Sequence, residues 1–323
     1  MSRQPVQEAW TLACLNAELT INLGMVIDRA THDSYLSALN SYLTFCRLHS
    51  LDIEPTQWTL ALFVTFQSAH INPKSVDTYI CNIANQFETH FPDVHAVRKS
   101  TLVSRALQGA KWRYGVPTSR KLPLTRDNLL TIYNVYGPNP PHDDLLFTAQ
   151  ILMGTDCLMW LAKLTWPDKL SLRDYRKVSM PHSVEFLPEG LSFWLPGHKA
   201  DKFFKGNRLI VHKGGSPDTH NRLCEYLASQ DLHFPLRPEL WLCGDSTLPT
   251  CSWFIARLHL FSPNSIVGQS MRAGGATALA EAGVAPNLIQ TAGRWMTDTF
   301  TCYIHKNPFL FEALLVGRSS LCS

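Results

Sequence analysis

The chain has 323 residues, of which 45% are hydrophobic, and a formal net charge of +3 at pH 7. This length exceeds that of a usual single domain, so we expect two domains, each with its own core. A charge of +3 is too small to indicate a nucleic-acid partner by itself, but the charge is spread unevenly along the chain.

Residues 1–113 are predicted to form a helical bundle. Apolar residues return at helical spacing in two segments, Tyr35, Leu39, Tyr42, Leu43 and Cys46, and then Val76, Ile80, Ile83 and Phe87. Pro55-Thr56 and Asn72-Pro73 predict helix starts, because Thr or Asn caps the first turn and proline presets φ there. A further helix is predicted over residues 99–112, with basic residues on its polar side.

The stretch from Val94 to Arg126 is basic and contains no Asp or Glu. Its Lys and Arg residues are Arg98, Lys99, Arg105, Lys111, Arg113, Arg120, Lys121 and Arg126. This run, rather than the net charge, is the signal for a polyanionic partner.

Residues 114–125 (YGVPTSRKLPLT) combine two prolines and a glycine with no helical period, which predicts a linker between the two domains. The second domain then covers residues 126–323. It begins with a helix over residues 126–136 and a long apolar helix over residues 144–163.

Alternation of period two predicts three strands, at residues 184–187, 191–195 and 208–211, and helices follow from residue 216 to the end. The predicted fold class is mainly α with a small three-stranded sheet (α+β).

The nine cysteines form no C-x-x-C pair and are odd in number, so we expect reduced, mostly buried thiols in an intracellular protein. The first residues lack the layout of a secretory signal, and the richest apolar run is interrupted by polar residues, so we expect neither secretion nor membrane insertion. The thirteen histidines show no metal-ligand spacing. We therefore expect no metal and no cofactor.

Residues 268–306 are the most informative segment. They place Gln269 three residues before Arg272, then a Gly-Arg-Trp turn with Arg294 and Trp295, then Tyr303. This layout resembles the catalytic domain of the tyrosine recombinase (integrase) family, in which His-x-x-Arg precedes a His or Trp and then the nucleophilic tyrosine. The amino-terminal helices resemble the core-binding (SAM-like) domain of integrase-like proteins, particularly those of fungal genomes and transposon-derived genes.

The resemblance implies roles for several residues. Transfer of a phosphodiester bond to a protein hydroxyl needs a nucleophile, cations on the phosphate and an acid for the leaving oxygen. By resemblance these are Tyr303, Arg272 with Arg294 or Trp295, and Lys199, with Lys202 and Lys205 as rivals on the same turn.

Each role has a structural alternative. In the structural alternatives, Tyr303 is a core tyrosine and Arg272 is a surface arginine in a salt bridge. The three lysines then lie at the solvated tip of a hairpin. Trp295 is otherwise a packing residue with Arg294 outside.

Three positions depart from the family pattern. Trp160 stands where the family has its first phosphate-binding arginine, Lys163 where it has an acidic residue, and Gln269 where it has the first histidine. Trp160 brings no charge and Gln269 carries no proton, and loss of one donor to a transition-state oxyanion typically costs about 10²–10³ in rate. On one helix, Lys163 would lie one turn beyond Trp160 and could bring a charge to the same pocket, although an ordinary surface charge is the alternative.

The resemblance implies a clamp around double-stranded DNA, a homo-oligomer on DNA, a nuclear protein, and breaking and rejoining of DNA through a 3′-phosphotyrosine without metal or nucleotide. The changes at Trp160 and Gln269 imply that this activity is weak or lost. The alternatives are a non-catalytic DNA- or chromatin-binding clamp and a helical protein-interaction scaffold.

Overall fold

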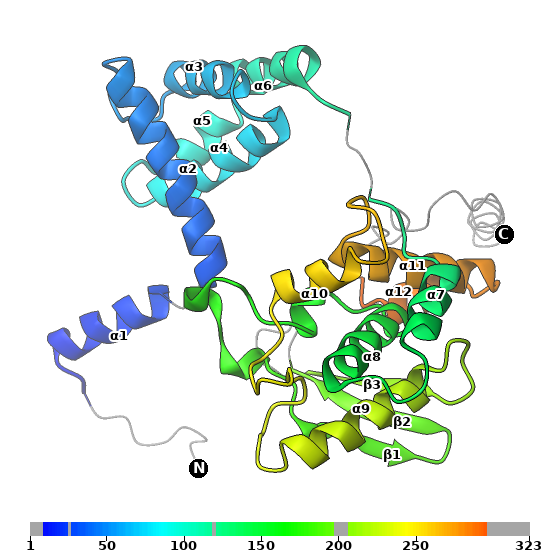
Figure 1. Cartoon of the computed structure of the whole chain (residues 1–323). Coiled ribbons are helices and arrows are strands. Elements are labelled where there is room, and N and C mark those ends of the chain that lie inside the picture. The colour runs from blue at the N-terminus through cyan, green and yellow to red at the C-terminus, as the bar shows by residue number, and fades with distance from the viewer. Residues whose placement is uncertain (1–8, 25–26, 118–120, 197–205, 296–323) are drawn as a thin grey trace, which may run out of the picture. The chain divides into compact units, whose positions relative to one another are not determined.

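The computed structural model describes residues 9–24, 27–117, 121–196 and 206–295. The chain divides into two compact units, Met1–Ser119 and Arg120–Ser323, each with its own hydrophobic core (Figure 1). Among the described helices, none combines the length and the apolar character needed to cross a membrane.

The described part of the first unit contains helices and no strand. The helices are α1 (Leu12–Gly24), α2 (Arg29–Leu48), α3 (Gln57–Ser68), α4 (Pro73–Phe87), α5 (Val94–Arg98) and α6 (Thr101–Tyr114).

The predicted helix starts at Thr56 and Asn72 are confirmed. The Thr56 hydroxyl accepts the backbone N–H of Thr59 at 3.2 Å, and the Asn72 side chain accepts that of Lys74 at 2.9 Å. Pro73 is the first residue of α4, where its missing N–H costs no hydrogen bond.

The core of the first unit is built around Tyr42 of α2, which is fully buried. Its ring makes edge contacts with Phe63 at 5.4 Å and Phe87 at 5.9 Å between centroids. α6 packs against α3 and buries Val103 and Leu107 in the same core. The helix predicted over residues 99–112 is therefore present, shifted by two residues at each end.

The second unit combines helices with a small sheet. Its helices are α7 (Arg126–Tyr136), α8 (His142–Asp156), α9 (Thr219–His233), α10 (Cys251–Leu258), α11 (Gly268–Glu281) and α12 (Pro286–Ala292). Short 3₁₀ turns are η1 (Leu161–Lys163), η2 (Leu170–Leu172), η3 (Tyr175–Lys177) and η4 (Pro181–Ser183). The strands are β1 (Glu185–Leu187), β2 (Gly190–Leu195) and β3 (Asn207–His212).

The three strands form an antiparallel sheet in the order β1-β2-β3, as the alternation predicted. Figure 1 shows α9 lying across the sheet, and the inward residues of β2 and β3 share a core with Leu223 and Tyr226 of α9. The predicted fold class, mainly α with a three-stranded sheet, is confirmed.

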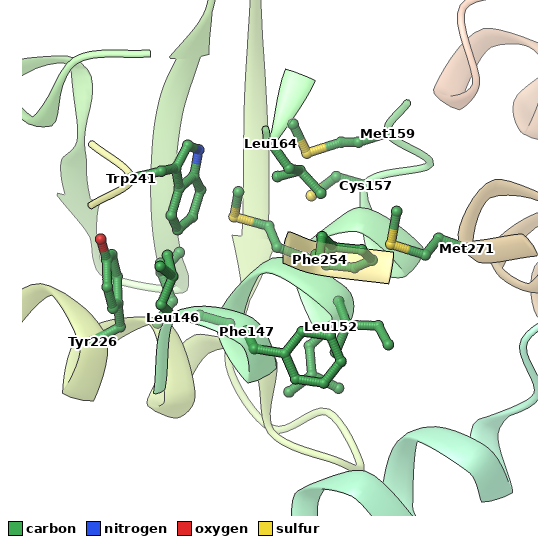
Figure 2. Packing of buried hydrophobic residues seen from close by; sticks show 14 of the residues in the cluster. Leu146, Phe147, Leu152, Cys157, Met159, Leu164, Tyr226, Trp241, Phe254 and Met271 are labelled. Atoms are coloured by element: carbon green, nitrogen blue, oxygen red, sulfur yellow. The ribbon is translucent and has the colours of Figure 1, made fainter. Parts of the chain in front are cut away.

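α8 is the buried centre of the second unit. Eleven of its residues are buried, and Figure 2 shows Phe147 of α8 near Phe254 of α10, with ring centroids 5.2 Å apart, while Met271 of α11 belongs to the same core. Residues 145–155 are buried on every side of α8, so the helix has no solvent-facing polar side there, and even the polar Thr148, Gln150 and Thr155 are buried.

The prediction that this helix continues to residue 163 is wrong, because α8 ends at Asp156. Leu158 takes a left-handed conformation with φ of 50°, and the N–H of Met159 bonds the carbonyl of Gly154 at 2.8 Å. This is a Schellman stop, which normally uses glycine in the left-handed position. Leucine there gave no sequence signal for a helix end.

Candidate functional site

Arg272 lies in α11 on the side that packs against α8. Two glycines let α11 pack closely on other backbone: a Cβ at Gly275 would lie 2.1 Å from the carbonyl oxygen of Thr155 in α8, and one at Gly274 would lie 1.9 Å from that of Leu124, which precedes α7. Close packing against another backbone therefore explains why two glycines occur inside this helix. As a result Arg272 is only 3% exposed, so its interpretation as a surface arginine is wrong.

The Arg272 guanidinium is bonded at its edges and covered on its faces. One terminal nitrogen donates to the carbonyl of Leu158 at 3.0 Å, and the other donates to the carbonyl of Gly293. The indole rings of Trp160 and Trp295 lie 4.8 and 4.2 Å from the guanidinium carbon. Charge-assisted hydrogen bonds contribute about 1.5–3 kcal/mol each and cation–π contacts about 0.5–2 kcal/mol. Arg272 therefore connects α11 to the ends of α8 and α12.

Arg294 is the second cation of the site. It follows α12 in a left-handed conformation with φ of 56°, which makes a second Schellman stop, since the N–H of Trp295 bonds the carbonyl of Gln290 at 3.1 Å. One guanidinium nitrogen of Arg294 donates to the carbonyls of Cys157 and Leu158, both at 3.1 Å. The carbonyl of Leu158 thus accepts hydrogen bonds from two arginines.

The two guanidinium groups make this region electropositive. Burial lowers the pKa of Arg294 from its ordinary value, because the charged form loses hydration. Burial also raises the pKa of the neighbouring Cys157 thiol to about 12, so this thiol stays protonated at neutral pH. Within the described part of the chain, no acidic side chain lies within 4 Å of Arg294. An anion placed here would reduce the repulsion between the two cations.

Trp295 and Arg294 both lie on the inner side of the turn, so the alternative that places Arg294 outside is wrong. Gly293 permits this arrangement, because a Cβ there would lie 1.7 Å from Cζ3 of Trp295. The indole folds back over the helix end and covers one face of Arg272.

Trp160 and Lys163 are not on one helix. Trp160 precedes the η1 turn and is 42% exposed, with its ring over Arg272. The ammonium of Lys163 donates to the carbonyl of Pro196 at 3.1 Å, beside the end of β2. The one-turn helical relation expected between the two residues is therefore wrong, and Lys163 is bound to the strand end.

Gln269 is the second residue of α11 and is exposed. It lies three residues before Arg272, so the two side chains leave the same face of the helix. Gly268 beside it allows close packing of η1, because a Cβ there would lie 2.6 Å from a methyl carbon of Leu161. The structure therefore places Gln269 at the exposed start of α11, almost one turn before Arg272.

Several predicted site residues lie outside the described residues: Tyr303, Lys199, Lys202, Lys205 and Arg120. Among the residues that the structure describes, no group of three or more His, Cys, Asp or Glu side chains is placed to hold a metal ion. The thiols of Cys46, Cys157 and Cys243 are buried, whereas Cys14 is exposed.

The basic run of the first unit is partly neutralised by the fold. Asp77 of α4 lies 2.8 Å from the ammonium of Lys111 and 3.8 Å from the guanidinium of Arg98. The basic run contains no acidic residue, so its sequence suggests that Lys111 and Arg98 are unpaired. In the fold, however, Asp77 comes from outside the run and pairs with both. Arg105 and Arg113 of α6 are exposed, as are Lys99, which follows α5, and Lys121 at the start of the second unit.

The sequence did not reveal the role of the backbone carbonyls in the site. The carbonyls of Leu158 and Gly293 hold Arg272, and both occur where a helix stops in a left-handed turn. A glycine after the helix is the usual signal for such a turn, and here leucine and arginine take its place.

Comparisons with known proteins identify the fold. The sequence matches no family model and no curated protein. Among solved structures, the chain is similar to the XerH site-specific recombinase bound to palindromic difH substrate in a post-cleavage complex, with a TM-score of 0.56 and 13% identity over 80% of this chain and 71% of that one.

Two integrases give similar results. A lambda integrase (75–356) dimer bound to a COC′ core site matches with a TM-score of 0.53 and 13% identity over 92% of this chain and 95% of that one. The Tn1549 transposon integrase in complex with transposon right end DNA matches with a TM-score of 0.52 and 13% identity over 83% and 86%. The fold of this chain is therefore that of the tyrosine recombinases.

Proposed function

We propose that this chain, which has the tyrosine recombinase fold, binds double-stranded DNA and holds a backbone phosphate beside Arg272 and Arg294. The observation that carries the proposal is the pair of guanidinium groups bonded to the single carbonyl of Leu158. Two cations this close favour an anion, and Arg294, which is partly exposed, would donate N–H groups to the phosphate, whereas the buried Arg272 would contribute its charge. The similar recombinases and integrases named above were solved with DNA, which supports the same partner here.

The reaction that this site supports, by resemblance, is breaking and rejoining of DNA. The Tyr303 phenol would lose its proton to water, its oxygen would attack the phosphorus and form a 3′-phosphotyrosine, the bond to the 5′-oxygen would break, and that oxygen would take a proton, with Lys199 as donor. Trp160 supplies no cation to the phosphate, and Gln269 supplies no proton. We therefore expect cleavage to be weak or absent.

A nicked suicide duplex tests the catalytic part, because it traps the covalent adduct. An adduct formed by the wild-type chain and lost in Tyr303→Phe would establish residual activity. If the double variant Trp160→Arg, Gln269→His is folded by circular dichroism and also forms no adduct on a panel of duplexes, the assignment of a recombinase site to Tyr303 fails.

A second candidate is a non-catalytic protein that keeps the clamp for binding DNA or chromatin. The indole of Trp160 favours it, because it covers a face of Arg272 where the family has a second arginine. This candidate predicts salt-dependent DNA binding that does not change in Tyr303→Phe. Binding that is insensitive to salt would argue against phosphate contacts and favour a protein-interaction scaffold.

The wider setting is proposed on the same basis. The first unit would act as a DNA-contacting core-binding domain, the chain would form a homo-oligomer on DNA, and the protein would work in the nucleus. Light scattering with and without a duplex tests the oligomer: a mass that stays at one chain per duplex contradicts it.

A further inference from the structure

The helix α6 presents one face to the core of the first unit and one to solvent. Val103, Leu107 and Ala110 are buried. The opposite side of the helix, called here the α6 outer face, consists of Thr101, Leu102, Arg105, Gln108, Gly109 and Trp112, all of them exposed.

Gly109 lies at an interior position of α6, where glycine weakens the helix. It is the ninth of fourteen residues in α6, and glycine is among the weakest helix formers at an interior position. A Cβ added there would meet no atom within 4 Å, whereas at Gly274 and Gly275 it would meet a carbonyl oxygen. No packing within the described chain explains Gly109, so the open space at this point suits the close approach of another molecule.

Trp112 lies almost one turn further along the same face and is 85% exposed. An indole this exposed adds no burial to the core, although large aromatic side chains dominate binding at many interfaces. Arg105 is on the same face and Arg113 beside it, and the sequence of α6 contains no acidic residue. The face therefore carries an exposed indole near its end and one cation, Arg105, with Arg113 beside it and no acidic residue, which is complementary to a polyanion.

We propose that the α6 outer face lies directly against duplex DNA, with Gly109 allowing close approach of the helix backbone and Trp112 contacting bases or sugars. The inference rests on the proposed DNA-binding function and assigns part of it to these residues. Arg105 contributes a phosphate contact, whereas Trp112 contributes an apolar contact that salt does not screen. Asp77 does not neutralise the charge of this face, because Asp77 pairs with Lys111 and Arg98, which lie beside the face.

The test measures binding of the full chain to a short labelled duplex by fluorescence anisotropy, between about 50 and about 200 mM salt. Trp112→Ala should weaken binding by about fivefold or more at every salt concentration, with the salt slope unchanged. Arg105→Gln should reduce the slope of log Kd against log salt by about 0.9, the value for one phosphate contact.

Gly109→Gln separates binding from folding. Glutamine is the better helix former, so the melting temperature should hold or rise while binding weakens by about fivefold or more. Trp58→Ala is the matched control, because Trp58 is 62% exposed on α3 of the same unit, and its affinity should equal that of the wild type.

Two results overturn the inference while the proposed function stands. In one, the wild type binds the duplex and the α6 variants bind equally well; in the other, Trp58→Ala loses as much affinity as Trp112→Ala. A wild-type chain that does not bind duplex DNA at the lowest salt overturns both proposals.

Discussion

Replacing Trp160 by arginine should destabilise the second unit, although it restores the residue that the recombinase pattern has at this place. The indole of Trp160 lies 4.8 Å from the guanidinium carbon of Arg272, and its loss removes a cation–π contact of about 1 kcal/mol. A new charge at about 6 Å from Arg272 would add a repulsion of about 3 kcal/mol at an effective dielectric constant of about 20. Arg294 shares a carbonyl with Arg272 and adds to this repulsion. We expect a loss of about 2–4 kcal/mol, since the new side chain can turn partly to solvent.

Urea unfolding of the full chain measures this effect, with Trp160→Ala and Trp160→Phe beside it. The alanine variant loses the ring without gaining a charge, so Trp160→Arg should be less stable than Trp160→Ala, and the gap should narrow at high salt. Trp194→Ala controls for the loss of buried side-chain area, because Trp194 is 43% exposed and Trp160 is 42% exposed. A Trp160→Arg variant as stable as the wild type, or more stable than Trp160→Ala, would refute the repulsion argument.

Three further predictions concern packing, charge and pH. Gly274→Ala should cost about 2–4 kcal/mol or prevent folding, because its Cβ would lie 1.9 Å from a carbonyl oxygen, and a wild-type urea midpoint would contradict this. Asp77→Asn releases its two paired cations, so duplex affinity should rise and its salt slope steepen; an unchanged slope in anisotropy titrations would show that these cations do not contact DNA. Burial raises the pKa of Glu239, but hydrogen bonds from Tyr175 and Arg237 outweigh it and hold the pKa below the ordinary 4.5. The carboxylate therefore stabilises the fold above about pH 4.5 and this contribution is lost as the pH falls through its folded pKa, so Glu239→Gln should flatten the stability profile in that acid range, as measured by urea unfolding.

Local chemistry explains the elements that were predicted well. Thr56 and Asn72 can each satisfy an orphan N–H of the first turn, which specifies a helix start without any tertiary contact. In β3 buried and exposed residues alternate, because one face of this strand packs on the core, so its period is visible in the sequence, whereas the central strand β2 is buried at nearly every residue.

Tertiary contacts explain the parts that were missed. After α8 ends at Asp156, Leu158 makes a left-handed turn, and two arginines more than a hundred residues away donate to the carbonyl of Leu158. The end of this helix therefore has no signal in the nearby sequence. Asp77 likewise reaches Lys111 only because α4 and α6 pack together. The candidate arginines could be named from the sequence, but the indole rings around Arg272 depend on how three separate turns meet.

The most direct test of the phosphate site compares the wild type with Arg294→Gly in duplex binding across salt concentrations. Glycine keeps the left-handed turn at φ of 56° and removes the charge, so the fold should persist. We predict salt-dependent binding by the wild type and a slope of log Kd against log salt that is smaller by about 0.9 in Arg294→Gly. Equal slopes for the two proteins, or a wild-type chain that does not bind duplex DNA, would contradict the assignment of Arg294 and Arg272 to a DNA phosphate.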